Sequence, residues 1–238
     1  MNTHPQPQRS PELMDSPSLG FDETERALCD LERINRWTLG LAAIRRTLQE
    51  QMVDDARPQT LLDIGTGSGQ VSALVAEDCR SRGLTLRVIG LDYKLCHLVI
   101  GRQRGHRQLR VVAAAEQLPF RVGSVDWVIS NLFFHHFDEP ENSRILDEMR
   151  RVCRRAAVIS DLRQSILARL LARLLLPLLG TGRVALHDGK LSADQAWEMH
   201  RVEALTAAAE SSELRKRFPF RFGLVMQSLT SRPGGDAL

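Results

Sequence analysis

Cysteine is scarce in this chain, with four residues in 238, and no two of them form a C-x-x-C pair. Pairs of that kind are the usual signature of a structural zinc site, so the sequence predicts no metal site. The first residues also lack the pattern of a signal peptide. We therefore expect reduced thiols in a cytoplasmic protein.

Long apolar runs are missing as well. Residues 165–179 are rich in leucine, but the longest uncharged run there, residues 174–182, is too short to cross a bilayer and contains Pro177. Neither sign of charge dominates, since 32 Lys and Arg face 29 Asp and Glu and leave a net charge of +3. That mild excess, together with the basic residues at 102–107, is typical of a solvated surface. No nucleic-acid partner is expected.

The length suits one α/β domain with additions. Residues 1–20 begin with a stretch rich in Pro, Gln and Ser and are expected to be disordered. Residues 21–57 predict two helices that form an N-terminal cap over the substrate side. Residues 58–238 form the main domain, with an insertion at about 163–211.

The most informative segment is residues 61–70, which predict a buried strand, a glycine-rich turn and the start of a helix. About twenty residues later a second predicted strand, 88–91, is followed by Asp92. In α/β proteins, glycines let the backbone approach a nucleoside, and a carboxylate at the next strand grips the ribose hydroxyls. A dinucleotide site would have its third glycine at position 70, where this chain has Gln70.

The order acid-x-G-x-G-x-G, from Asp63 to Gly69, resembles motif I of the class I S-adenosylmethionine (SAM)-dependent methyltransferases. The resemblance implies SAM as the cofactor. It implies that the acid of the first strand positions the loop and the cofactor's ammonium group. It also implies that Asp92 accepts from both ribose hydroxyls. The cofactor-binding residues expected on this basis are Asp63, Gly65, Thr66, Gly67, Gly69, Asp92, Tyr93, Ala115, Glu116 and Asn131.

Later segments extend the resemblance over roughly residues 58–162. Residues 114–120 are similar to the family segment that lines the adenine, but Ala113 and Ala114 stand where the family often has Gly-Asp. The usual carboxylate partner of the adenine amino group is therefore missing, and either Glu116 or the backbone of residues 115–116 is expected to recognise that group. Residues 124–131 are similar to the family's fourth strand, whose end faces the transferable methyl group.

Alternating strands and helices predict a parallel sheet. With the family resemblance, the expected fold is a Rossmann-like class I methyltransferase fold, with a mostly parallel seven-stranded sheet flanked by helices and an inserted helix after strand 5. Another helix is expected at 192–211. The alternating residues 218–226 are expected to supply the last strands, antiparallel at one edge.

Residues 165–179 predict an amphipathic helix, for which several roles stay open. The helix could pack over the sheet edge, form an apolar wall for the substrate, make a homodimer surface or lie on a membrane. The oligomeric state is a monomer or a homodimer. The flanking segments 12–15, 31–36 and 187–192 resemble small bacterial methyltransferases associated with polyketide and phenolic metabolism.

Histidines are the candidate catalytic groups, because a hydroxyl acceptor must lose its proton to a base, and the best base has a pKa near the working pH. His135 and His136 follow the fourth strand, where the fold presents the methyl group. His187 stands beside Asp188, which could orient it. An acceptor that needs no histidine, or one deprotonated by Asp161, is the alternative.

The sequence as a whole predicts methyl transfer from SAM to a small, aromatic or polyketide-like acceptor, with oxygen slightly ahead of carbon. Residues 130–133 lack the two prolines of enzymes that methylate amide or base nitrogens. The alternatives are an RNA or protein methyltransferase, a non-catalytic SAM-fold binding protein and, disfavoured by Gln70, an NAD(P) oxidoreductase.

Overall fold

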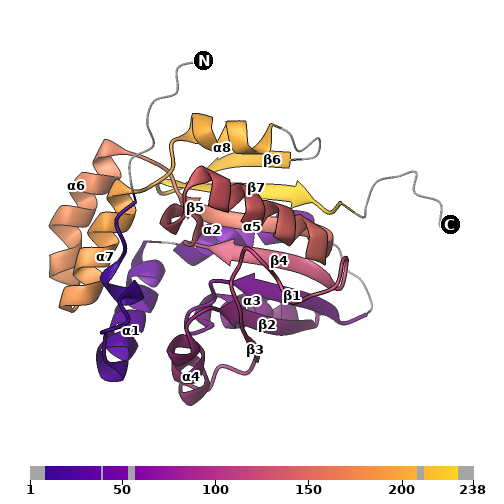
Figure 1. The fold of residues 1–238 in the computed structure, drawn as a ribbon, viewed down its shortest axis with the longest axis horizontal. Coiled ribbons are helices and arrows are strands. Elements are labelled where there is room, and N and C mark those ends of the chain that lie inside the picture. Colours follow the sequence, from indigo (N-terminus) through magenta and orange to yellow (C-terminus); the bar gives the residue numbers. More distant parts are fainter. Residues whose placement is uncertain (1–8, 39, 53–56, 208–211, 230–238) are drawn as a thin grey trace.

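The computed structural model describes residues 9–38, 40–52, 57–207 and 212–229. Its centre is one seven-stranded sheet with the order β3-β2-β1-β4-β5-β7-β6 (Figure 1). The first five strands along the chain pair in parallel, and β7 runs antiparallel to both of its neighbours. The predicted mostly parallel seven-stranded sheet is confirmed. The strands are β1 (Gln59–Ile64), β2 (Leu86–Asp92), β3 (Leu109–Val112), β4 (Val125–Asn131), β5 (Cys153–Leu162), β6 (Ser212–Arg217) and β7 (Arg221–Gln227).

Helices cover both faces of the sheet, because its central strands are apolar on both sides. Along β4, Trp127 and Ile129 pack beneath α2 and α3, whereas Val128 packs beneath α5 and α8. The helices are α1 (Phe21–Trp37), α2 (Gly40–Gln51), α3 (Gln70–Ser81), α4 (Leu95–Gln103), α5 (Glu139–Val152), α6 (Ile166–Leu175), α7 (Arg183–Asp194) and α8 (Met199–Thr206).

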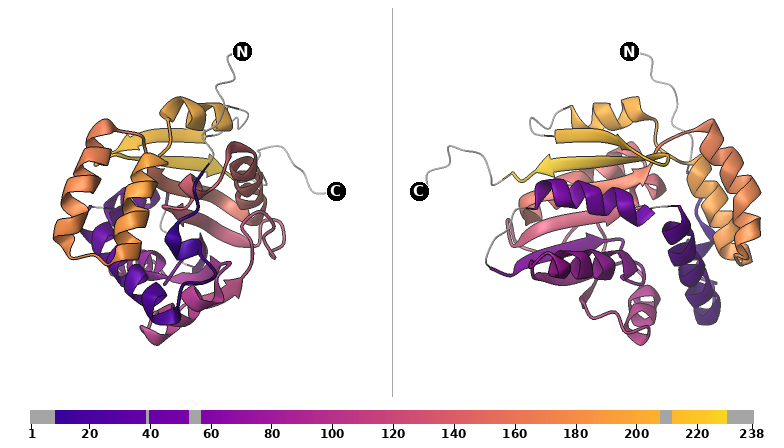
Figure 2. Two further views of the ribbon diagram at one scale, coloured as in Figure 1. Left: turned by 60° about the vertical axis from the view of Figure 1, so that its left-hand side comes forward. Right: turned by 180° about the vertical axis from the view of Figure 1, so that it is seen from behind.

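Three helices gather beyond the carboxyl ends of the parallel strands. Figure 2 shows α1, α6 and α7 side by side at that end of the sheet. α1 thus lies where the N-terminal cap was predicted, whereas the prediction is wrong for α2, which packs against β5 and β7 on one face of the sheet. The apolar side chains of α2, such as Ile44 and Leu48, are buried there against apolar residues of the sheet, which removes them from water. Residues 53–56 of the predicted cap lie outside the described residues.

The expected disorder of residues 1–20 is wrong for residues 9–20, and residues 1–8 lie outside the described residues. The segment 9–20 contains a short 3-10 helix at Leu13–Asp15, which packs against α7 beyond the carboxyl ends of the parallel strands. The backbone N–H groups of Leu13 and Met14 donate to the carboxylate of Asp188, at 2.8 and 2.9 Å. A buried carboxylate thus fixes the segment despite its polar composition.

In its described residues the insertion after β5 holds three α-helices, where two were expected at 165–179 and 192–211, and the single helix expected at 192–211 is wrong. The chain leaves α7 at Asp194 and begins α8 only at Met199. Between them Trp197 is 3% exposed, and its backbone donates to Leu162 and accepts from Gln164. Burial of this indole and its bridge to the end of β5 override local helix propensity. Residues 208–211 lie outside the described residues.

The C-terminal strands also differ from expectation. Residues 221–227 form β7 as predicted, but β6 is formed by residues 212–217, whose polar sequence is typical of an edge strand. Residues 218–220 form the turn between them. Among the described residues, no helix is both long and apolar enough to span a membrane.

Candidate functional site

The turn after β1 adopts backbone conformations that favour glycine. Gly65 and Gly67 have φ values of 66° and 55°, in the left-handed region. A Cβ at Gly65 would overlap the ring of Phe133, whereas one at Gly67 would meet only Leu28, at 3.5 Å. Gly69 is the N-cap of α3. The turn therefore exposes its backbone at the carboxyl edge of β1, where the sequence predicted a nucleoside site.

Asp63, the acid within β1, points to the same side and is almost completely buried. Its carboxylate accepts a hydrogen bond from the hydroxyl of Thr66 at 2.6 Å, which ties the strand to the turn. Burial raises the pKa of Asp63 to about 6, and the hydrogen bond from Thr66 opposes that rise. Near neutrality the site therefore holds a buried negative charge that lacks a cationic side chain among its hydrogen-bond partners within the described residues.

Asp92 ends β2 beside the turn and is 5% exposed. One carboxylate oxygen accepts from the backbone N–H of Gly67 at 2.9 Å, and the other accepts from Lys94 N–H at 2.9 Å. His97 Nδ1 lies 3.3 Å from Asp92 Oδ1. Tyr93 is half exposed and donates its hydroxyl proton to Asp15 at 2.8 Å. Asp92 thus joins the glycine turn to β2, with its side chain at the edge of the cavity.

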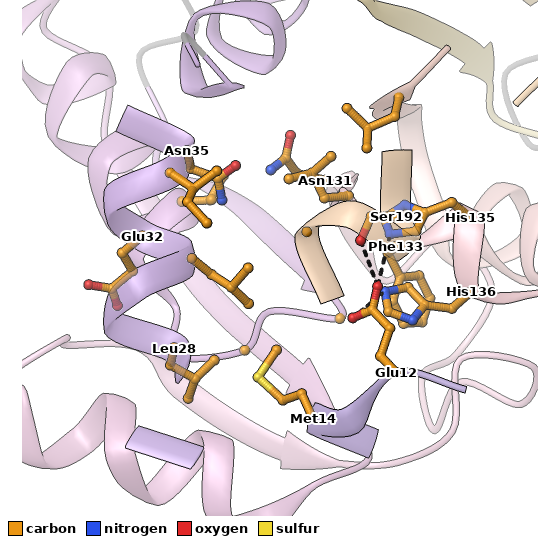
Figure 3. Close-up of a pocket in the computed structure, with 18 of the residues that line it drawn as sticks. Glu12, Met14, Leu28, Glu32, Asn35, Asn131, Phe133, His135, His136 and Ser192 are labelled. Carbon is orange, nitrogen blue, oxygen red and sulfur yellow. Dashed lines mark hydrogen bonds and ion pairs between the residues drawn. The ribbon is translucent and has the colours of Figure 1, made fainter. Parts of the chain in front are cut away.

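A cavity of about 1130 Å³ begins at these residues. Ala115 and Glu116, which follow β3, line its wall, as does Asn131 at the end of β4. The side-chain oxygen of Asn131 is buried and has no hydrogen-bond partner within the described residues. A buried acceptor without a partner is costly, and a ligand that donates to it would remove the cost. Figure 3 shows Asn131 across the cavity from α1.

Comparison with known proteins fits this geometry. Residues 62–160 match the family profile of a methyltransferase domain. The structure superposes on a SAM-dependent methyltransferase from Aquifex aeolicus with a TM-score of 0.60, covering 85% of this chain and 97% of that chain at 16% identity. Residues 62–160 therefore resemble a methyltransferase domain, and the chain has the fold of SAM-dependent methyltransferases.

Two further relatives broaden the family comparison. The magnesium protoporphyrin IX methyltransferase from Synechocystis PCC 6803, solved with bound SAM, has a TM-score of 0.55 and 13% identity, covering 89% of this chain and 92% of that chain. A demethylmenaquinone methyltransferase from Thermotoga maritima is 30% identical over 105 residues, which are 44% of this chain and 43% of that protein. The chain thus matches less than half the length of this curated relative.

The other end of the cavity is apolar. Leu28, Leu31 and Ile34 of α1 face it from one side, and Leu171 and Leu175 of α6 face it from another. Phe133 and Phe137, beyond β4, stack edge to face with ring centroids 4.7 Å apart. The cavity is larger than the roughly 300–1,000 Å³ of ordinary small-molecule sites. It therefore has space for a cofactor and a second, largely apolar molecule.

His135 and His136 stand between the two ends of the cavity. His135 Nδ1 lies 2.7 Å from Asp161, which is itself fully buried and also accepts from the backbone N–H groups of Phe133 and His135. Burial alone would lower the pKa of His135, but Asp161 and Glu12 outweigh it and raise the pKa to about 9. His136 is partly exposed to the cavity, with its Nδ1 3.5 Å from Asp15.

His187 is placed differently. It lies on α7 with its side chain 49% exposed, and it is not among the residues that line the cavity. Its Nδ1 lies 2.8 Å from Asp188, so the predicted pairing with the adjacent carboxylate is present. Asp188, however, also accepts from the backbone of the segment 9–20. The pair joins α7 to the N-terminal segment.

Sequence reasoning missed the role of that N-terminal segment. Arg9, Glu12 and Met14 line the cavity, although the sequence suggested disorder there. Glu12 is 6% exposed and accepts a hydrogen bond from Ser192 at 2.6 Å. Figure 3 shows Glu12 between Ser192 and the two histidines. The resemblance of residues 12–15 to small methyltransferases was the signal that could have indicated an ordered segment.

Proposed function

We propose that this chain binds SAM and transfers its methyl group to a small, flat, apolar acceptor. The observation that carries the proposal is one cavity with two chemically different ends. One end combines the glycine turn, Asp63 and Asp92, and the other is walled by leucines and phenylalanines. A charged, nucleoside-containing cofactor suits the first end, and an aromatic or polyketide-like acceptor suits the second.

The residues at the polar end fit SAM. The buried charge of Asp63 would attract the ammonium group, and Asp92 would accept from the ribose hydroxyls. The turn at Gly65–Gly69 would present its backbone at the glycines, where no side chain intervenes. Thr66, Tyr93, Ala115, Glu116 and Asn131 complete the proposed cofactor site. SAM supplies an electrophilic methyl group on a sulfonium, and the protein's share is mainly orientation and exclusion of water.

We favour an oxygen atom of the acceptor slightly over a carbon atom as the methylation site. Two histidines and three carboxylates cluster on the acceptor side, and such groups can take the proton that a hydroxyl must lose. His135 and His136 line the cavity and are the proposed acceptor-side groups. His187 lies outside the lining, so we propose no direct contact with the acceptor for it. The demethylmenaquinone methyltransferase relative is compatible with a small aromatic acceptor. Methylation of RNA or protein, and SAM binding without turnover, are the alternatives.

The first test is titration calorimetry with SAM and with NAD⁺. We expect SAM to bind and NAD⁺ not to bind, and we expect SAM affinity to fall at acid pH. SAM's ammonium group needs an ionised Asp63, whose pKa is about 6 in the free protein. Above pH 7 the affinity should be level, and at pH 5 it should be about tenfold weaker, since each pH unit below the pKa removes about nine tenths of the ionised form.

The variant Asp63→Asn serves as the control, because it keeps the shape but cannot titrate. Its affinity should be lower and should not change between pH 5 and 8. Tight NAD⁺ binding without SAM binding would contradict the proposed function. A pH dependence that survives in Asp63→Asn would instead assign the titration to another group.

We also propose that the outer face of α6 rests on a membrane surface. Leu167, Leu170 and Leu174 lie on that face and are 54%, 50% and 65% exposed, and Leu178 follows at 79%. Arg169 lies on the same helix and could attract anionic lipid, as basic residues of amphipathic helices do. Arg173 instead pairs with Asp194 at 2.9 Å. A lipophilic acceptor could then pass from the bilayer into the cavity, whose wall is the inner face of α6.

Co-sedimentation with vesicles of phosphatidylcholine and phosphatidylglycerol tests the membrane proposal. Leu174→Glu should weaken binding by about tenfold or more, because full burial of a leucine side chain is worth roughly 1.5–3 kcal/mol. Leu109→Glu is the matched control, since Leu109 is 68% exposed on β3, away from α6, and its replacement should leave vesicle binding unchanged. Equal binding by all three proteins would refute the proposal. A dimer that Leu174→Glu dissociates would assign the face to self-association.

A further inference from the structure

Three side chains from distant parts of the sequence converge beside the acceptor end of the cavity. Glu12 lies 3.6 Å from His135 Nε2 through one carboxylate oxygen and 3.9 Å from His136 Nε2 through the other. One ligand atom from each residue lies within 4.8 Å of the other two. Metal–ligand bonds of about 2.1 Å place tetrahedral ligand atoms about 3.4 Å apart. The three atoms therefore surround a space of the size that a first-row metal ion needs.

The groups behind these side chains hold them in place. The other ring nitrogen of His135 lies 2.7 Å from the buried carboxylate of Asp161, which is the arrangement that orients metal-ligating histidines. Glu12 accepts from the hydroxyl of Ser192 at 2.6 Å, and His136 Nδ1 faces Asp15 at 3.5 Å. Each of the three side chains thus has a partner that fixes its direction.

We propose that Glu12, His135 and His136 bind a divalent first-row metal ion such as Zn²⁺, and that this ion holds the acceptor's oxygen. Two histidines and one carboxylate leave further coordination positions open, as catalytic metal sites do. All three residues line the cavity, so the open positions face it. The inference rests on the proposed methyltransferase function and adds that the acceptor atom is an oxygen, as in a phenol or enol.

The chemistry of such a site is simple to balance. Coordination of a hydroxyl to a divalent cation lowers the hydroxyl's pKa, so its proton is released to solvent before transfer. The oxygen then forms the new O–CH₃ bond while the S–CH₃ bond breaks and its electron pair stays on sulfur. The products are a thioether, a methyl ether and one proton, with no change of oxidation state at the metal.

The cysteine-based reasoning that predicted no metal site could not find this cluster. Glu12 is more than a hundred residues from the histidines, and it reaches them because the segment 9–20 is tied to α7 through Asp188 and Ser192. Without a metal the same three side chains would form a buried network of ion pairs. The experiment must therefore separate a metal site from that network.

The test is metal analysis of the purified full chain, followed by calorimetric titration of chelator-treated protein with ZnCl₂. We expect one zinc ion per chain, and we expect Glu12→Gln and His136→Gln each to weaken zinc binding by at least a hundredfold. His200→Gln is the matched control, because His200 is exposed beside Glu198, with a nitrogen 3.4 Å from its carboxylate, and should bind zinc no differently from wild type. Co²⁺ added in place of zinc should give a visible absorption spectrum in the wild type that both ligand variants lack.

SAM titration of the same proteins separates this inference from the proposed function. Glu12→Gln and His136→Gln should keep wild-type SAM affinity, because neither residue belongs to the proposed cofactor site. No stoichiometric zinc, or equal zinc binding by wild type and both variants, would overturn the metal site while SAM binding stands. Loss of SAM binding by the wild type would instead overturn the proposed function. His136 is partly exposed, so its variant should fold even if Glu12→Gln does not.

Discussion

Replacing Gly67 by valine is expected to abolish SAM binding while leaving the far-UV circular dichroism spectrum nearly unchanged. Gly67 has a φ of 55°, and a β-branched residue is strained in that conformation. Strain of about 1–3 kcal/mol is relieved if the turn rotates. Rotation would break the 2.9 Å hydrogen bond from Gly67 N–H to Asp92 and move the backbone that is proposed to face the cofactor. Calorimetry should show at least a hundredfold loss of affinity.

Gly83→Val is the matched control for this prediction. Gly83 has a φ of 82° in the turn between α3 and β2, at the opposite end of α3 from the glycine turn, and a Cβ there would meet nothing within 4 Å. The variant should show a comparable loss of stability with unchanged SAM affinity. If Gly67→Val binds SAM as tightly as Gly83→Val does, the turn does not contact the cofactor as proposed.

The part of the fold that the sequence predicted well is the part with local and periodic signals. The strand of residues 61–64, its glycine turn and Asp92 follow one another within about thirty residues, and parallel pairing brings them to one edge. The only tertiary contact that this arrangement needs is the pairing of two neighbouring strands, β1 and β2. For this reason the sheet agrees with expectation, and the residues of the proposed cofactor site lie together at its edge.

The parts of the fold and of the site that the sequence did not predict depend on contacts between residues far apart in the chain, which no local sequence pattern encodes. Trp197 ends α7 and delays α8 because its backbone bridges to the end of β5. Glu12 becomes part of the cavity because Asp188, far along the chain, accepts from the two residues after it. The sequence showed His187 beside Asp188, but it could not show that this carboxylate serves the N-terminal segment and not the cavity.

Replacing Asp92 by alanine is expected to weaken SAM binding by about tenfold to several hundredfold, because a hydrogen bond to a charged group is worth roughly 1.5–3 kcal/mol. The carboxylate has two roles in the structure, however. It also accepts from Gly67 and Lys94, so the variant could lose affinity through a loosened turn alone. A single affinity measurement would not separate the two roles.

A thermodynamic cycle on the ligand separates them. S-adenosylhomocysteine and its 2′,3′-dideoxy analogue differ only in the ribose hydroxyls, so the turn affects both ligands alike. The wild type should prefer the hydroxylated ligand by at least tenfold, and Asp92→Ala should prefer it by less than about twofold, because the charged hydrogen-bond acceptor is gone. A variant that keeps the full wild-type preference would show that Asp92 holds the turn and that another group recognises the ribose.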